Sequence, residues 1–368
     1  MYHCLFDLSS YSKGQSAGFN SFIEALIPAL DKFSSIECDI KFTFIVQKSQ
    51  SQFIKLLAPT SQVSHFAGSP KIIGPLIRNI FLPFISCFYD LLICPRQYAP
   101  LFALSKTFLI VHDLQSQPVE SCPSNIYRLL KKLRLLLSCH CSDVISTISQ
   151  FTATELKSHN VMPKYIIPNP YSPNLLLSSD TLDEYLPSDV SKDNYFITPS
   201  SLADHKNISN ALSAFHSFCE SSPSLSYQYI LIGNWSIESF YNLFPLYIDC
   251  PRIVPLGYVD EMTKAALFKF SSAFLLPSIY EGFGIPYLEA LSLSKPLICS
   301  DIPVCREICI NHPFYISSPF DSVSIYYALM SCLLCIKEYS YSYDVSSFSP
   351  ESIALRYLTA FKAIMLPK

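Results

Sequence analysis

One short stretch constrains the fold of this chain more than any other: an apolar run followed closely by two glycines and a proline. The run Ala273–Leu276 has the composition of a parallel strand that is covered on both faces. Gly282 and Gly284 follow, and glycine lets the backbone approach a ligand closely. Pro286 suits the first turn of a helix, where its missing N–H costs nothing. The sequence therefore predicts a buried strand, a short glycine-containing loop and then a helix.

Two carboxylates flank this junction. Glu281 precedes the glycines, and we expect Glu289 in the first turn of the helix. Free N–H groups at a helix start favour an anionic or hydroxyl-rich ligand, and carboxylates accept hydrogen bonds from sugar hydroxyls. One interpretation is that both glutamates hold a sugar nucleotide. The alternative is a tight turn in another Rossmann-like domain, with both glutamates merely solvated.

The filled motif EGFGIPYLE, from Glu281 to Glu289, resembles the Glu-x7-Glu signature of retaining GT-B glycosyltransferases of glycosyltransferase family 4. The wider run PSIYEGFGIPYLEALSLSKPLICSDIP is similar to that family over its whole length. The resemblance is strong over residues 195–310, moderate over 105–170 and poor in the first hundred residues. It implies an α/β protein of GT-B architecture, with two Rossmann-like domains facing across a cleft.

The polar, acidic segment 178–193 has the composition of a surface connector, so we place the boundary between the two domains near residue 173. Residues 1–173 would form the acceptor-side domain and residues 174–348 the nucleotide-sugar-binding domain. Residues 349–368 would form a C-terminal helix that crosses back to the first domain. Ser349 and Pro350 support a helix start there, since serine is a good N-cap and proline suits the first helical position.

Two loops outside the main motif also resemble the family. Lys206, after the predicted strand 195–198, matches a lysine that neutralises the donor's diphosphate; the alternative is a solvated lysine at a helix start. His112, after the predicted strand 107–111, matches a histidine that contacts the donor sugar; the alternative is a capping or core histidine. His205 stands where arginine is common, and the glycine expected near Ser200 is absent.

The resemblance implies a metal-independent, retaining transfer of a hexose from a nucleotide diphosphate sugar to a hydroxyl of a glycan or lipid-linked acceptor, in cell-surface polysaccharide or glycolipid synthesis. Glu281, His112 and Lys206 would be the catalytic residues. The donor would be held by Lys206, Gly282, Phe283, Gly284 and Glu289. No cofactor other than the donor is expected. The alternatives are a catalytically silent GT-B protein that binds a partner glycosyltransferase or a glycan, and an epimerase or phosphorylase of the same fold.

Composition sets outer limits on these functions. The formal net charge of −3 argues against a general nucleic-acid binder. The fourteen cysteines show no paired Cys-x2-Cys spacing, so we expect reduced thiols. No Asp-x-Asp motif occurs in a suitable loop, so we expect no metal. The first residues lack the basic segment of a secretory signal. We therefore expect a cytoplasmic protein.

A basic helix raises the question of membrane contact. Residues 128–137 alternate Leu with Lys and Arg at helical spacing. One interpretation is a helix resting on an anionic membrane at its cytoplasmic face. The alternative is an ordinary surface helix of the first domain.

Overall fold

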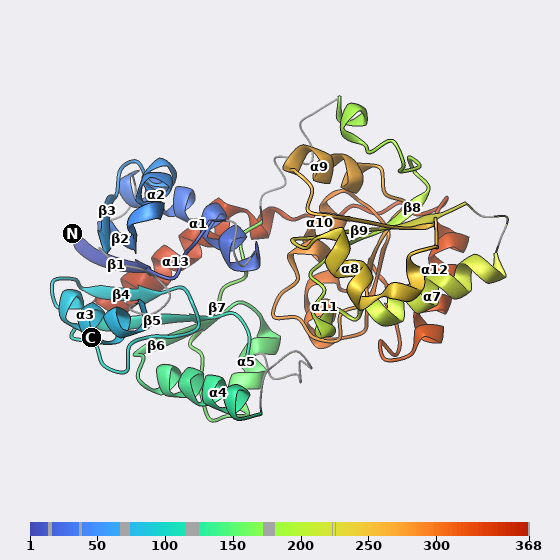
Figure 1. The fold of residues 1–368 in the computed structure, drawn as a ribbon. Coiled ribbons are helices and arrows are strands. Elements are labelled where there is room, and N and C mark those ends of the chain that lie inside the picture. Colours follow the sequence, from blue (N-terminus) through green and yellow to red (C-terminus); the bar gives the residue numbers. More distant parts are fainter. Residues whose placement is uncertain are drawn as a thin grey trace. The chain divides into compact units, whose positions relative to one another are not determined.

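The computed structural model describes residues 1–13, 17–36, 39–66, 74–114, 125–171, 181–222, 224 and 226–366. Within it the chain forms two compact units, each built on a parallel sheet (Figure 1). The N-terminal unit comprises Met1–Ser116, Cys122–Ser172 and Ser346–Lys368. The C-terminal unit comprises the described residues from 181 to 345. The expected boundary near residue 173 lies outside the described residues.

The sheet of the N-terminal unit has the strand order β3-β2-β1-β4-β5-β6-β7. Its strands are β1 Tyr2–Leu8, β2 Ile40–Gln47, β3 Gln62–Phe66, β4 Leu91–Cys94, β5 Lys106–Val111, β6 Val144–Thr147 and β7 Tyr165–Ile166. Its helices are α1 Ala17–Ile36, α2 Ser51–Leu57, α3 Gly74–Ser86, α4 Asn125–His140, α5 Gln150–Lys157 and α13 Pro350–Met365, with short 3-10 turns η1 Lys48–Gln50 and η5 Ser346–Phe348.

The last helix, α13, belongs to the N-terminal unit and packs against α1. Ser349 caps it by accepting a hydrogen bond from the Ser352 N–H, as its sequence predicts. Tyr357 and Phe361 are fully buried on the face that meets the sheet. Phe361 lies edge-on to Phe108 of β5, with ring centroids 5.0 Å apart.

The sheet of the C-terminal unit has the order β10-β9-β8-β11-β12-β13. Its strands are β8 Tyr195–Pro199, β9 Gln228–Ile232, β10 Ile253–Gly257, β11 Ala273–Leu276, β12 Leu297–Ser300 and β13 Phe314–Ile316. Its helices are α7 Ile208–Ser221, α8 Ile237–Leu243, α9 Glu261–Lys269, α10 Ile285–Ser292, α11 Pro303–Cys309 and α12 Ser322–Cys335, with 3-10 turns η2 Leu182–Tyr185, η3 Asp204–Lys206 and η4 Pro245–Tyr247.

All described strand pairs in both sheets are parallel. In the C-terminal unit the order of connection reverses between the neighbouring strands β8 and β11. Ligands of open α/β sheets bind outside the carboxyl ends of the strands at such a reversal. The loops that follow β8 and β11 are therefore where a site is expected, and they carry Lys206 and Glu281.

No helix in the described part of the chain combines the length and apolar character that crossing a bilayer requires.

Candidate active site

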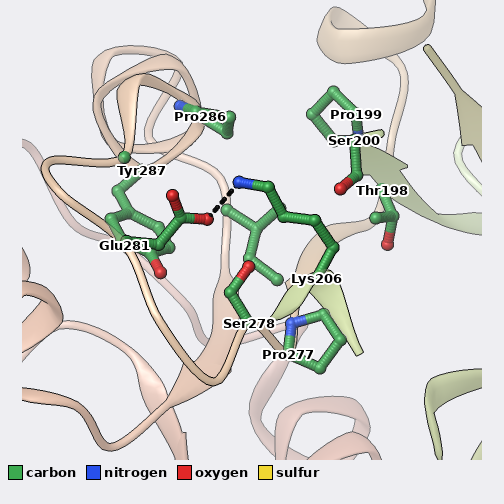
Figure 2. Close-up of a pocket in the computed structure, with 11 residues that line it drawn as sticks. Thr198, Pro199, Ser200, Lys206, Pro277, Ser278, Glu281, Pro286 and Tyr287 are labelled. Atoms are coloured by element: carbon green, nitrogen blue, oxygen red, sulfur yellow. Dashed lines mark hydrogen bonds and ion pairs between the residues drawn. The ribbon is translucent and has the colours of Figure 1, made fainter. Parts of the chain in front are cut away.

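The loops after β8 and β11 bring Lys206 and Glu281 together in one pocket (Figure 2). The Lys206 ammonium donates to Oε1 of Glu281 over 2.5 Å, and the two side chains are only 20% and 15% exposed. The pocket is lined by Thr198, Pro199, Ser200, Lys206, Leu276, Pro277, Ser278, Glu281, Gly284, Pro286 and Tyr287. The structure thus brings Lys206 and Glu281, which are 75 residues apart in the sequence, into one pocket.

Gly284 shapes the entry into α10. It is the N-cap of that helix at a φ of +90°, a conformation that side-chain-bearing residues rarely adopt. A Cβ atom there would come within 2.4 Å of the Tyr287 ring. Pro286 lies in the first turn, as its sequence position predicts. The glycine therefore lets the start of α10 and its backbone form one wall of the pocket.

The other residues expected to bind the donor differ in their placement. Phe283 is buried and, like Gly282, is not among the side chains that line the pocket. Glu289 is not in the first turn of α10, so that expectation was wrong: α10 begins at Ile285 and has no acidic residue in its first turn. Because Gly284 is the N-cap, the helix starts immediately after it, and Glu289 falls in the second turn.

Glu289 has a partner that the sequence did not indicate. Its Oε1 accepts a hydrogen bond from Lys264 of α9 over 2.7 Å, and the glutamate is 9% exposed. Burial alone would lower the pKa of Lys264, but the neighbouring Glu289 carboxylate outweighs this and raises it. Lys264 therefore orients Glu289 through one carboxylate oxygen, and the second oxygen keeps acceptor capacity for a ligand hydroxyl.

Asn207, which follows Lys206, connects the loop after β8 to the loop after β11 by hydrogen bonds. It lies in the left-handed region at a φ of +59° and is 8% exposed. Its side-chain amide donates to the carbonyls of Pro277 and Pro319 over 3.0 and 2.6 Å. The Ile279 N–H adds a backbone bond to the His205 carbonyl over 2.8 Å. We did not foresee this role, although asparagine is the residue that most readily tolerates that conformation after glycine.

His205 brings no second positive charge to the pocket. Burial first, and then the adjacent Lys206 ammonium, lower the pKa of His205 below its ordinary value. The histidine is consequently neutral at pH 7. Lys206 therefore supplies the formal positive charge that the β8 loop offers to a ligand.

The loop around Ser200 is supported by the neighbouring strands in place of the expected glycine. The Trp235 indole donates to the Ser200 carbonyl over 2.9 Å. Gly233 makes this approach possible, since a Cβ there would lie 1.9 Å from the Ser200 carbonyl oxygen. Gly233, the residue after β9, thus leaves room for the Ser200 carbonyl and the Trp235 indole to meet.

His112 lies at the end of β5 in the N-terminal unit. Its Nε2 donates to the Pro95 carbonyl over 2.8 Å, and its ring meets Phe22 edge-on at 4.9 Å. Burial lowers the pKa of His112 to about 4, against the opposing hydrogen bond to Pro95. The ring is therefore neutral at pH 7 with its proton on Nε2, which leaves Nδ1 as its acceptor atom.

This lowered pKa predicts an acid-sensitive N-terminal unit. Above pH 6.5 His112 is neutral in both folded and unfolded chains, so it contributes no pH dependence. Between pH 6.5 and about 4 the unfolded chain binds a proton that the folded chain does not, so stability falls as the pH drops. Over this window we expect the free energy of unfolding of His112→Gln, measured with urea, to fall by about 3 kcal/mol less than that of the wild type. The exposed His140→Gln is the control and should follow the wild type; an unchanged pH profile for His112→Gln would contradict the prediction.

Comparison with known proteins bears on the identity of this pocket. Residues 187–325, which include Lys206, Glu281 and Glu289, match the family described as glycosyl transferases group 1. This part of the chain is a glycosyl transferases group 1 domain. The chain is 25% identical over 232 residues to the O-antigen chain mannosyltransferase RfbU of Salmonella typhimurium, covering 61% of this chain and 60% of that protein. It is 27% identical over 229 residues to O-antigen chain mannosyltransferase B of Escherichia coli, covering 58% of each. The matches thus span about 60% of the length of these relatives.

Solved structures extend the fold likeness to the whole chain. Anabaena Alr3699/HepE, in complex with UDP and glucose, aligns with a TM-score of 0.66 at 16% identity over 99% of this chain and 97% of that one. The lipopolysaccharide outer core galactosyltransferase WaaB aligns with a TM-score of 0.62 at 14% identity, over 99% of each chain. The predicted fold class, α/β with two Rossmann-like domains of the GT-B type, is confirmed. The cleft between the domains stays a prediction.

Proposed function

We propose that this chain is a retaining hexosyltransferase that uses a nucleotide diphosphate sugar and a glycan or lipid-linked acceptor in the synthesis of a cell-surface polysaccharide. The observation that carries the proposal is the paired Lys206 and Glu281 in one pocket at the reversal between β8 and β11. The O-antigen mannosyltransferases among the relatives support mannose as the hexose. The UDP complexes among the structural neighbours support a nucleoside diphosphate as the leaving group.

The proposed role of Lys206 is electrostatic. As the glycosidic bond of the donor breaks, negative charge develops on the departing diphosphate. An ammonium group has three N–H donors, so Lys206 can hold Glu281 and a phosphate oxygen at once. The ion pair fixes the direction of the ammonium before the donor arrives, which reduces reorganisation during the reaction. In this proposal Lys206 and the N-terminus of α10 supply the positive potential, without a metal ion or cofactor.

The proposed role of Glu281 is to hold the sugar. Its second carboxylate oxygen accepts hydrogen bonds from sugar hydroxyls, and its charge favours the positive charge that develops at the anomeric carbon. Backbone N–H groups of the segment from Gly282 to Gly284, Phe283 included, assist at the start of α10. Glu289, oriented by Lys264, takes the ribose hydroxyls. His112 meets the donor sugar through Nδ1.

In the proposed reaction the bond between the anomeric carbon and the diphosphate oxygen breaks, and a bond from that carbon to the acceptor oxygen forms. The acceptor hydroxyl transfers its proton to the leaving diphosphate, so no separate base is required. The configuration at the anomeric carbon is retained.

A panel of nucleotide sugars tests the proposal. A ligand that binds only the folded chain stabilises it by about 2.7 kcal/mol at a concentration a hundredfold above its Kd. We expect the melting temperature to rise by several degrees with the true donor, GDP-mannose being the first to try beside UDP- and ADP-linked hexoses. Mass spectrometry and NMR of the product then identify the sugar and its anomeric configuration.

Three outcomes would overturn parts of the proposal. No shift with any nucleotide favours the catalytically silent alternative. A sugar nucleotide that is converted without any added acceptor favours an epimerase. An inverted anomeric centre in the product removes the retaining mechanism while leaving transfer intact.

A further inference from the structure

Helix α4 of the N-terminal unit is apolar on its outer side as well as its inner side. It buries Leu135 and Cys139 in the core of that unit. At 3.6 residues per turn, the exposed leucines fall on a stripe about 100° wide on the opposite side of the helix. These leucines are Leu129, Leu130, Leu133 and Leu137. A surface helix normally presents polar residues there, so the stripe requires an explanation.

Helix α3 and the residue just after its turn repeat this arrangement. Leu82 is buried, whereas apolar side chains at the same spacing of i, i+1, i+4 and i+8 face outward. These side chains are Ile80, Phe81, Phe84 and Phe88, the last of which is 81% exposed. Four large apolar groups exposed on one short segment are unusual for a surface that meets only water.

The segment 95–105 joins the two helices into one face. Phe102, itself half exposed, lies edge-on to Phe84 with ring centroids 6.2 Å apart. On the other side, the Ser138 hydroxyl of α4 donates to the Ala99 carbonyl over 3.2 Å. Both helices cover the same side of the sheet, since Leu82 and Leu135 share one core cluster (Figure 1). We call this surface the α3–α4 face; it is formed by residues 80–88, 101–104 and 129–137.

The charge of this face is positive. Lys131 and Arg134 are exposed on α4 to one side of the leucine stripe, and the Arg134 guanidinium lies 4.5 Å from the centroid of the Tyr98 ring. The stretches 74–86, 95–105 and 125–140 contain no Asp or Glu at all, although the chain as a whole has 29 acidic residues and a net charge of −3. The positive charge is therefore local and lies on the same helix as the exposed leucines, beside their stripe.

We propose that the α3–α4 face docks on a lipid bilayer that contains anionic lipids. Leucine and phenylalanine side chains would enter the boundary between headgroups and acyl chains, while Lys131 and Arg134 stay at the phosphates by extending along their stems. A protein partner fits less well, because lysine is depleted from the buried centres of protein interfaces. This inference concerns binding alone and does not depend on the proposed reaction.

Sedimentation with vesicles, in the absence of any nucleotide sugar, tests the proposal on the full chain. We expect the chain to sediment with vesicles that mix phosphatidylcholine and phosphatidylglycerol, and to be released by 0.5 M salt. The variant Leu130→Asn/Leu133→Asn should reduce the partition coefficient about 100-fold, since two leucines no longer leave water. Lys131→Gln should reduce it about fivefold.

Matched controls separate docking from general hydrophobicity. Leu56 of α2 and Leu334 of α12 are 79% and 81% exposed and lie away from this face in sequence. Their replacement by Asn should leave vesicle binding unchanged. The proposal is overturned if the wild type stays in the supernatant with anionic vesicles, or if the controls lose binding as the α4 variant does. It is likewise overturned if the α4 variant merely abolishes self-association in sedimentation velocity, which would assign the face to a second copy of the chain. Circular dichroism melts confirm that each variant is folded.

Discussion

Replacing Lys206 by methionine is expected to lower kcat/KM for sugar transfer about 100- to 1,000-fold, the usual effect of removing one preorganised charge-stabilising group. Methionine keeps an apolar stem of similar length but provides no ammonium. The diphosphate would lose its positively charged partner, because His205 beside it is neutral. The affinity for the nucleoside diphosphate should fall with the rate, whereas that for the nucleoside alone should not change. Calorimetric titration with both ligands measures the difference.

The same substitution should also destabilise the C-terminal unit, and this effect must be separated from the chemical one. It leaves Glu281, only 15% exposed, without its partner at 2.5 Å, at a cost of about 1–3 kcal/mol. The double variant Lys206→Met/Glu281→Gln removes both charges and should recover most of that stability without recovering transfer. Lys192→Met is the matched control, since it breaks an exposed ion pair with Asp183 away from the pocket. Full activity in Lys206→Met would contradict the proposed role.

The C-terminal unit was largely predictable because its strands are short apolar runs that parallel sheets bury on both faces. The strand β11 occupies the predicted residues Ala273–Leu276, and β8 covers the predicted strand 195–198. The N-terminal unit was less so. Helix α3 was not predicted, because Pro83 inside it and the continuous apolar composition around it conceal any helical period. Burial on one side and exposed apolar groups on the other cannot be distinguished from sequence alone.

In the predicted site, too, some residues could be placed from the sequence and others could not. Lys206 and Glu281 each follow a recognisable strand, so their meeting depended only on β8 and β11 being neighbours in the sheet. The partners of Glu289 and Asn207 come from elements distant in sequence: Lys264 on α9, and the carbonyls of Pro277 and Pro319. Such contacts follow from tertiary packing, which no local pattern specifies. The placement of Glu289 failed for a local reason, the N-cap at Gly284.

Glu281→Gln is expected to lower the rate of transfer without weakening nucleoside diphosphate binding, whereas Lys206→Met lowers both. The amide keeps an oxygen acceptor for sugar hydroxyls but removes the negative charge near the anomeric carbon. It also relieves repulsion between the carboxylate and the donor phosphates and replaces the ion pair of Lys206 with a weaker hydrogen bond, so the ammonium is held less firmly away from the ligand. Nucleoside diphosphate affinity should therefore be retained or increase, while kcat for transfer falls about 100-fold or more.

Comparison with Glu281→Ala shows whether the lost transfer rate depends on the negative charge of Glu281 or on its hydrogen bonds to sugar hydroxyls. If the carboxylate acts mainly by charge, the Gln and Ala variants should transfer equally slowly. If it acts mainly by holding hydroxyls, the Gln variant should retain most of the rate that the Ala variant loses. Glu220→Gln, on an exposed glutamate of α7, is the control and should behave as the wild type in both assays. Undiminished transfer by Glu281→Ala would remove this residue from the mechanism, because an interaction made only in the transition state cannot be lost without lowering kcat.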